Sequence, residues 1–236
     1  MLPQDPQGML ADSFGHDRIL RRLPVYLLID TSGAMTGAPI QAVNTGLRLI
    51  HDELMKDPMA IETLWLSLIT FGTEARQIVP LAPITQFAPP QLTADGGTSL
   101  GAALWLLNQK LDEDIIRNSP ERKGDYKALV LIMIMGSPSD AWEPAAEAMR
   151  SSQKQKLATI TALGCGGADG VEESILRRIA DHVLMMAYVS DDQFYSFFRW
   201  VSQSVSMASK SAQAAADDQE AETELPAPPE GIKIIF

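Results

Sequence analysis

The fold is decided by Val25-Tyr26-Leu27-Leu28-Ile29-Asp30-Thr31-Ser32-Gly33-Ala34-Met35. Five apolar or aromatic residues run directly into an acid, two hydroxyl side chains and a glycine, a pattern that predicts a buried strand followed by a polar turn and a helix. In a parallel α/β sheet, ligands bind beyond the carboxyl ends of the strands. We therefore expect Asp30, Ser32 and the first amides of the next helix to converge on one point.

Strands and helices alternate along the rest of the chain. Residues 128–135 form the most hydrophobic run, which is typical of a central strand buried on both faces. Residues 62–71 and 77–83 flank a short polar loop and predict an antiparallel hairpin. The prediction is an α/β domain with a doubly wound, mostly parallel central sheet, one antiparallel edge strand and helices on both faces. The other expected strands are 24–30, 157–163 and 183–188, and the helices are 39–56, 98–117, 142–156, 171–180 and 193–213.

Composition shifts divide the chain into four parts. Residues 1–20 are polar and read as an irregular arm, and residues 21–210 form the domain. Residues 211–230 are acidic and rich in alanine and proline, which predicts a flexible linker. The apolar end, 231–236, is expected to dock on a sheet edge or in a groove of this molecule or a partner, with a disordered end as the alternative.

Length and composition bound the class of protein. The chain has 236 residues, 46% hydrophobic and 21% charged, as in one substantial globular domain. A net charge of −11 argues against a nucleic-acid partner, which requires a concentrated basic face. The longest apolar run, 128–135, is far shorter than the ~20 residues of a membrane span. Because Cys165 is the single cysteine, an internal disulfide is excluded. The single cysteine and the lack of a visible signal peptide predict a cytoplasmic location.

Hydroxyl side chains gather at the expected binding end of the sheet. Thr31, Ser32, Thr98 and Ser99 follow strands or precede helices, so they are candidates for a recognition face or for accepting a phosphate. The alternative is purely structural, because Ser32, Thr98 or Ser99 can cap the helix that follows it. No nucleophile–base pair and no histidine or cysteine spacing typical of a metal site is present, which favours a protein that is not an enzyme.

Four stretches together resemble von Willebrand factor A (vWA) domains. The pattern is most similar to the TerY-like bacterial branch associated with tellurium-resistance gene clusters. The matching stretches are residues 21–33 (Arg21 to Gly33), 96–101 (Gly96-Gly97-Thr98-Ser99-Leu100-Gly101), 136–142 (Gly136-Ser137-Pro138-Ser139-Asp140-Ala141-Trp142) and 228–236 (Pro228 to Phe236). The resemblance covers the chain from about Arg21 onward and implies the vWA, Rossmann-like fold.

The resemblance also implies a metal-ion-dependent adhesion site, at which a divalent cation bridges to a partner protein. Asp30, Ser32 and Thr98 match its metal ligands, whereas the second serine of the pattern is Ala34 and the later aspartate falls on Met135. An alanine methyl supplies no oxygen, and a thioether is too soft to replace a carboxylate for Mg²⁺. The expectation is a degenerate site with weak or no Mg²⁺ binding, unless Asp140, Asp95 or water molecules complete the ligand shell.

The function that these features predict is a non-enzymatic protein-interaction module without a resident cofactor. Its expected interaction face is Thr31, Ser32, Thr98, Ser99 and Asp140. The resemblance places it in a tellurium-resistance, stress-response or phospho-signalling system, with a protein kinase, a phosphatase or other tellurium-resistance proteins as partners. The alternative is a Mg²⁺-dependent binding protein or enzyme-complex subunit with a working metal site.

Overall fold

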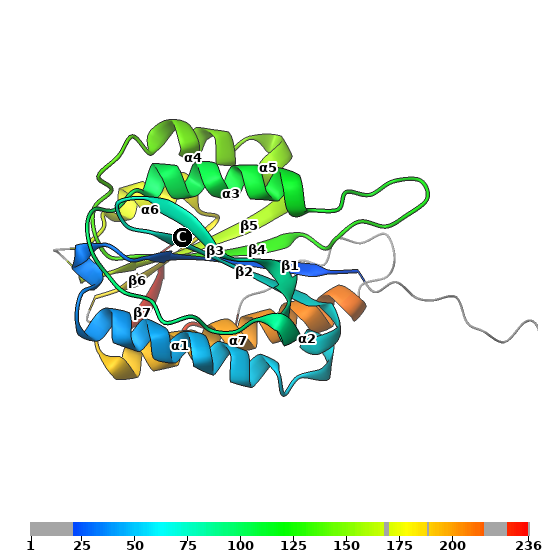
Figure 1. The fold of residues 1–236 in the computed structure, drawn as a ribbon, viewed down its shortest axis with the longest axis horizontal. Coiled ribbons are helices and arrows are strands. Elements are labelled where there is room, and N and C mark those ends of the chain that lie inside the picture. Colours follow the sequence, from blue (N-terminus) through cyan, green and yellow to red (C-terminus); the bar gives the residue numbers. More distant parts are fainter. Residues whose placement is uncertain (1–20, 168–169, 188, 215–225, 236) are drawn as a thin grey trace, which may run out of the picture.

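The computed structural model describes residues 21–167, 170–187, 189–214 and 226–235. These residues form a seven-stranded sheet in the order β3-β2-β1-β4-β5-β6-β7 (Figure 1). Five neighbouring strands are parallel, and β3 and β7 pair antiparallel at the two edges. The predicted mostly parallel sheet is confirmed, with β7 as an antiparallel edge strand in addition to the predicted β3. The strands are β1 (Leu23–Asp30), β2 (Leu64–Phe71), β3 (Ala75–Pro83), β4 (Ala128–Ile134), β5 (Ala158–Cys165), β6 (His182–Met186) and β7 (Ile232–Ile235).

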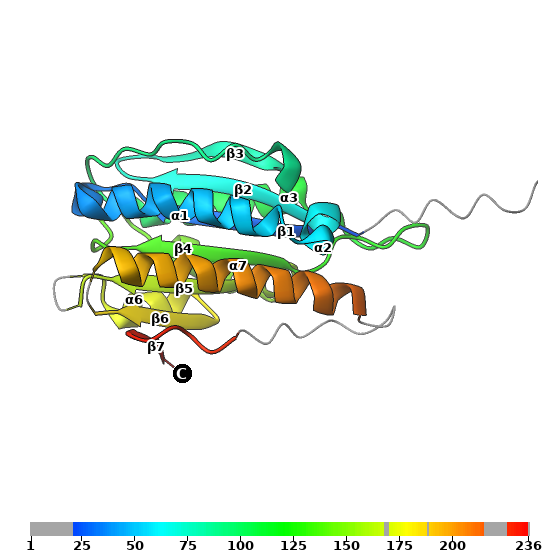
Figure 2. The same ribbon diagram turned by 90° about the horizontal axis from the view of Figure 1, so that it is seen from below.

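Helices cover both faces of the sheet, as expected for a doubly wound fold (Figures 1 and 2). One face carries α1 (Ala38–Leu54), α2 (Pro58–Thr63) and α7 (Asp191–Ala214), which lie in front of the strands in Figure 2. The other face carries α3 (Leu100–Asp114), α4 (Glu143–Met149), α5 (Ser152–Leu157) and α6 (Glu173–Ile179). Short 3₁₀ turns at Gly33–Met35 and Ile84–Gln86 complete the described elements.

The strand β1 is buried along its whole length and divides the core into two layers. Val25, Leu27 and Ile29 pack into the apolar layer beneath α1 and α7. Tyr26 and Leu28 point the opposite way, into the layer beneath α3, because successive side chains of a strand alternate between the two faces of the sheet. A continuous apolar run, with no polar alternation, is therefore what a central strand of this sheet requires.

One expectation about helices was wrong. Residues 142–156 were expected to form one helix, but α4 ends at Met149 and α5 begins at Ser152, because Ser151 between them has extended backbone, with ψ of 146°. The helix α2, which was not expected, begins at Pro58. The Asp57 carboxylate accepts a hydrogen bond from the Met59 amide at 3.0 Å, and proline suits a first helical position.

The apolar C-terminal residues form β7, which pairs antiparallel with β6. Ile232 and Ile234 pack on the α7 side of the sheet, and Ile235 packs on the α3 side. Before this strand, the Trp200 indole on α7 donates a hydrogen bond to the Pro226 carbonyl at 2.9 Å. The expected arm at 1–20, the greater part of the expected linker (215–225) and Phe236 lie outside the described residues.

Helices α1 and α7 approach closely at a glycine. A β-carbon built on Gly46 would overlap the ring of Phe198, so the helices can pack at this distance only because position 46 has no side chain. Phe198 is itself fully buried among the aromatic side chains of α7.

Replacing Gly46 with alanine is expected to lower the free energy of unfolding by about 1–2 kcal/mol. Overpacking against Phe198 costs about 1–3 kcal/mol, and the better helix propensity of alanine offsets up to about 1 kcal/mol of it. Urea denaturation followed by circular dichroism measures the change. Thr45→Ala, at the exposed neighbouring position of α1, is the control and should stay within about 0.5 kcal/mol of the parent. A Gly46→Ala protein more stable than the parent would contradict this packing.

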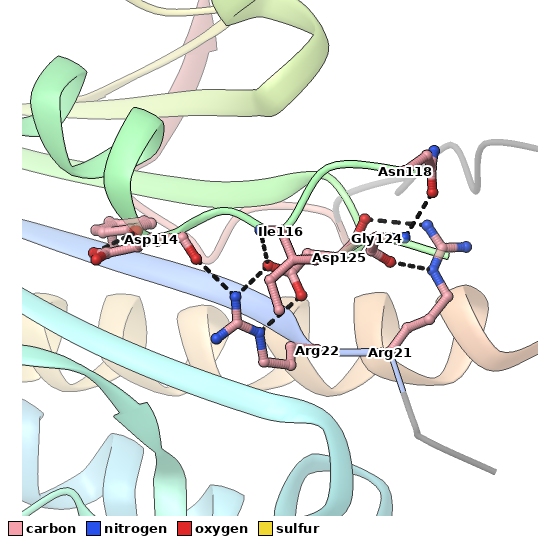
Figure 3. Close-up of polar contacts among 8 residues, drawn as sticks. Arg21, Arg22, Asp114, Ile116, Asn118, Gly124 and Asp125 are labelled. Atoms are coloured by element: carbon pink, nitrogen blue, oxygen red, sulfur yellow. Dashed lines mark hydrogen bonds and ion pairs between the residues drawn. The ribbon is translucent and has the colours of Figure 1, made fainter. Parts of the chain in front are cut away.

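A buried polar network closes the end of the sheet opposite to Asp30. Arg22, which precedes β1, donates from Nε and Nη2 to the two carboxylate oxygens of Asp125, at 2.8 and 2.5 Å (Figure 3). The Ile116 amide donates to the same carboxylate at 2.8 Å, and Arg22 also donates to the Asp114 carbonyl at 2.7 Å. The Asp125 hydrogen bond and charge raise the pKa of Arg22. The connection between α3 and β4 is thus fastened to the start of β1.

Candidate functional site

The candidate site lies where β1 and β4 end side by side. These strands are parallel neighbours, so the residues that follow Asp30 and Ile134 emerge at the same edge of the sheet. The loop that leads into α3 reaches the same place, since the Gly33 amide donates to the Gly96 carbonyl at 2.9 Å. This is the edge at which parallel α/β sheets bind ligands.

Asp30 ties the loops after β1 and β4 together. Its carboxylate accepts hydrogen bonds from the amides of Ser32 at 2.7 Å, Met135 at 2.9 Å and Gly136 at 3.3 Å. The side chain is 0% exposed, and no ion pair to it is formed within the described residues. A buried charge is tolerated only where hydrogen bonds or opposite charge compensate it. Here three amide donors take that role.

Three side chains converge around Gly136. A β-carbon built on this glycine would lie 2.8 Å from Thr98 Oγ1, 3.6 Å from Ala34 Cβ and 3.7 Å from Ser32 Oγ. We call these four residues, Ser32, Ala34, Thr98 and Gly136, the hydroxyl corner. Ser32 is only 2% exposed, and its hydroxyl has no hydrogen-bond partner among the described residues. An unpartnered buried hydroxyl is uncommon and calls for an explanation.

The other predicted face residues have structural partners. The Asp140 carboxylate accepts hydrogen bonds from the amides of Gly101 and Ala102, both at 2.9 Å, and thereby caps α3. Ser99 Oγ donates to the Thr73 carbonyl at 2.7 Å, and neither Ser99 nor Ser32 caps the helix that follows it. The alternative that Ser32 or Ser99 acts as a helix cap is therefore not confirmed. An aspartate 39 residues away along the chain supplies the cap.

Backbone hydrogen bonds hold Thr31 and Thr98 in place. The Thr31 amide donates to the Phe71 carbonyl at 2.8 Å, and its carbonyl accepts from the Asp95 amide at 2.9 Å. The Thr98 amide donates to Ser139 Oγ at 2.9 Å, which links the loop before α3 to the loop after β4. The Asp95 carboxylate accepts from the Gly96 amide at 2.7 Å. Asp95 and Asp140, the two carboxylates considered as extra metal ligands, are thus both engaged by amides.

Sequence reasoning missed two residues that shape the site. The buried Asn44 on α1 accepts from the Leu92 amide at 2.7 Å and donates to the Leu92 carbonyl at 3.0 Å, which anchors the loop that carries Thr98. Its signal was a polar residue within the apolar stripe of a helix. Gly136 belongs to a stretch that resembles vWA domains, but its close contact with Thr98 depends on the fold and has no local signal.

Cys165 is buried at the end of β5, close to the site. Burial, reinforced by the negative charge of Asp30, raises the pKa of its thiol far above the usual range. A thiol held in its neutral form is a poor nucleophile and a poor metal ligand. Elsewhere in the described part of the chain, no group of three or more His, Cys, Asp or Glu side chains is arranged to hold a metal ion.

The comparisons with known proteins identify the family and the fold. The sequence profile of the von Willebrand factor type A domain matches residues 25–197. The chain belongs to this family. Domains of this type are generally protein-interaction modules. No curated protein matches the chain significantly.

Solved structures share the von Willebrand factor type A fold with low sequence identity. A von Willebrand factor type A protein from Catenulispora acidiphila has a TM-score of 0.58 and 17% identity over 79% of this chain and 43% of its own. The pilus adhesin SpaC from Lactobacillus rhamnosus GG has a TM-score of 0.61 and 15% identity, over 80% of this chain and 31% of its own. The mussel byssus proximal thread matrix protein 1 with a zinc-occupied MIDAS motif has a TM-score of 0.54 and 17% identity, over 80% of this chain and 46% of its own. This chain spans less than half the length of each.

The metal-ligand pattern implied by the family leaves few oxygen donors here. Asp30 supplies the one carboxylate, and Ser32 and Thr98 supply two hydroxyls. Ala34 places a methyl group in the hydroxyl corner, and Met135 contributes its amide to Asp30 rather than a carboxylate to a cation. Mg²⁺ takes six hard oxygen ligands in octahedral geometry, so this donor set fits it poorly.

Within the described residues, no helix is both long and apolar enough to cross a membrane.

Proposed function

We propose that this chain is a non-enzymatic protein-interaction module that binds its partner at the carboxyl end of β1 and β4. The interaction face comprises Thr31, Ser32, Thr98, Ser99 and Asp140, with the hydroxyl corner at its centre. The observation that carries the proposal is the buried, unpartnered hydroxyl of Ser32, which lies near Gly136 as the Thr98 hydroxyl does. Membership of the von Willebrand factor type A family supports it.

The proposed module works without a resident metal ion. Asp30 offers one buried carboxylate, whose oxygens already accept three amide hydrogen bonds, and the Ala34 methyl group stands where the family pattern has a ligand oxygen. A site with fewer anionic ligands binds divalent cations more weakly. The degenerate adhesion site would therefore use direct contacts with the partner in place of a bridging cation.

The side chains around the corner support a role other than catalysis. The Cys165 thiol is buried and its pKa is raised. The two described histidines lie elsewhere: His51 is in the last turn of α1, and His182 begins β6. Neither is placed to activate Ser32 or Thr98 as a nucleophile, which requires a base within hydrogen-bonding distance.

We further propose the cellular setting from the resemblance to the TerY-like branch. A tellurium-resistance, stress-response or phospho-signalling system in the cytoplasm is the context that its sequence stretches support. A protein kinase, a phosphatase or another tellurium-resistance protein is then the expected partner. Affinity purification from the native host, followed by mass spectrometry, identifies what is bound.

Changing Thr98 to lysine is expected to reduce partner capture at least about tenfold, a loss of roughly 1.4 kcal/mol. Thr98 belongs to the hydroxyl corner and is 5% exposed, so a longer, charged side chain there changes the surface that the partner is proposed to contact. Quantitative pull-down measures the loss, and Thr98→Val, which removes only the hydroxyl, serves as a milder second variant.

Thr45→Lys, on the exposed face of α1, is the matched control and should capture as much partner as the parent. Circular dichroism of each variant checks that the fold persists. If both Thr98 variants are folded and capture undiminished amounts of every partner, the interaction face is not at this edge of the sheet.

A further inference from the structure

The strand β7 covers the outer edge of β6 (Figure 2). The two strands pair antiparallel, and each residue from Ile232 to Ile235 lies opposite one residue of β6. The sequence of β6, His182–Met186, contains no Asp, Glu, Lys, Arg or Pro. An edge strand without charges or prolines readily pairs with another extended segment. The edge of β6 is therefore a strand-binding site, which the chain itself fills.

The strand that fills this site is short and lies at the end of a long connection. Ile232 is 5% exposed and Ile234 is half-buried, both on the α7 side of the sheet, whereas Lys233 is exposed. Residues 215–231 connect α7 to β7. The family profile ends at residue 197, so β7 lies outside the matched region. A short terminal strand on a long connection is an element that two copies of a chain can exchange.

We propose that the edge of β6 also binds the C-terminal strand of a second copy of this chain. The two copies exchange β7 reciprocally and form a closed dimer with two-fold symmetry. A second copy fits because its residues 232–235 make the same backbone pairs and place Ile232 and Ile234 in the same apolar layer as the chain's own strand does. This surface is separate from the interaction face proposed above, and the inference does not rest on that function.

The length of the connection decides which copy fills the edge. The Trp200 indole, which donates to the Pro226 carbonyl at 2.9 Å, lies about 21 Å before the end of α7 at Ala214, since a helix rises about 1.5 Å per residue. Residues 215–225 span at most about 36–40 Å when extended, so the chain can return along α7 to its own edge. Such a tether gives an effective concentration of the order of 1 mM. Exchange between copies therefore becomes substantial only near this protein concentration.

The test mixes two full-length variants that each carry one new cysteine. Met185 on β6 and Lys233 on β7 lie opposite each other, and the Cα atoms of such pairs are about 4.5–5.5 Å apart, within the range of a disulfide. Met185→Cys mixed with Lys233→Cys at about 1 mM in a glutathione redox buffer should form a disulfide-linked heterodimer on a non-reducing gel. At about 10 µM the yield should fall at least about tenfold. The native Cys165 is buried and does not take part.

Two controls separate strand pairing from chance collision of thiols. Ser137→Cys, at an exposed position after β4, takes the place of Met185→Cys and should give no heterodimer above the background of the dilute mixture. Lys233→Cys combined with Ile232→Asp and Ile234→Asp should also give none, because a carboxylate without a partner is costly in the apolar layer that these isoleucines occupy.

A shortened chain tests the role of the connection. Deleting residues 215–225 joins Ala214 to Pro226, so β7 cannot reach its own β6 while α7 stays intact. With both Met185→Cys and Lys233→Cys, the shortened chain should form intermolecular disulfides at about 10 µM, where the full-length double variant should form an intramolecular one. Size-exclusion chromatography with light scattering should then find a dimer for the shortened chain and a monomer for the full-length chain.

The inference is overturned if the mixture forms no more heterodimer than the Ser137 control, or if the two aspartate substitutions leave the heterodimer yield unchanged. A shortened chain that stays monomeric, or that purifies with a foreign peptide on the edge of β6, would overturn it as well. Partner capture by the Thr98 variants tests the other surface, so failure of one proposal is distinguishable from failure of the other.

Discussion

Replacing Asp30 with alanine is expected to lower the free energy of unfolding by about 3–5 kcal/mol. The substitution leaves the amides of Ser32, Met135 and Gly136 without their acceptor, and a buried donor left unpaired costs about 1–3 kcal/mol. The Met135 and Gly136 positions are half-buried, so water compensates part of the loss there. Urea denaturation followed by circular dichroism measures the difference.

The Asp30→Asn variant tests the effect of the negative charge of this side chain separately from the effect of its size. Asparagine keeps the size of the side chain but replaces one acceptor oxygen with an NH₂ group, which then faces an amide donor. We expect its destabilisation to be smaller than that of Asp30→Ala and still above about 1 kcal/mol. Asp52→Ala, an exposed carboxylate on α1, should stay within about 0.5 kcal/mol. An Asp30→Ala protein as stable as the Asp52 control would show that the three hydrogen bonds do not hold the loops.

Replacing Asp125 with alanine is the second large effect, again with a loss of about 3–5 kcal/mol. The Asp125 side chain is 2% exposed and receives hydrogen bonds from Arg22 and from the Ile116 amide. Removing one member of a buried ion pair leaves the other charge uncompensated, at a cost of about 3–5 kcal/mol. Arg22 retains its hydrogen bond to the Asp114 carbonyl and its stacking on the Trp65 ring, so the lower part of this range is expected.

The control for Asp125 is an ion pair at the surface. Glu74 and Arg76 lie 2.8 Å apart with both side chains about two-thirds exposed, and exposed pairs contribute about 0–1 kcal/mol. Glu74→Ala should therefore change stability by less than about 1 kcal/mol. Thermal and urea unfolding of both variants provide the comparison, and equal effects of the two substitutions would contradict the importance of burial at Asp125.

The sequence predicted the elements whose signals are local. The apolar run of β4 and the polar turn after β1 indicated a central strand and its binding end, and the hairpin of β2 with β3 followed from alternation and a short loop. The meeting of Ser32 with Thr98 was expected from the resemblance to vWA domains, because Thr98 precedes α3 and does not follow a parallel strand. The predictions of the strands needed only periodicity and chain direction.

What the sequence did not predict depends on contacts between distant segments. The cap of α3 comes from Asp140, which no local pattern around Ser99 could indicate. Asn44 and Leu92 are far apart in the chain, so their pairing appears only when the loop is folded over α1. The break between α4 and α5 arises from the backbone of Ser151, a residue type that helices tolerate.

The hydrogen bonds of Asp30 make the hydroxyl corner a property of the complete sheet. The amides that donate to Asp30 come from the loops after β1 and β4. These strands are about a hundred residues apart in the chain, so a partly folded molecule does not form the hydroxyl corner. A partner that recognises the corner therefore discriminates against immature or damaged chains without a separate inspection step. Because such a partner binds only the folded chain, its binding also shifts the folding equilibrium toward the folded state and stabilises it.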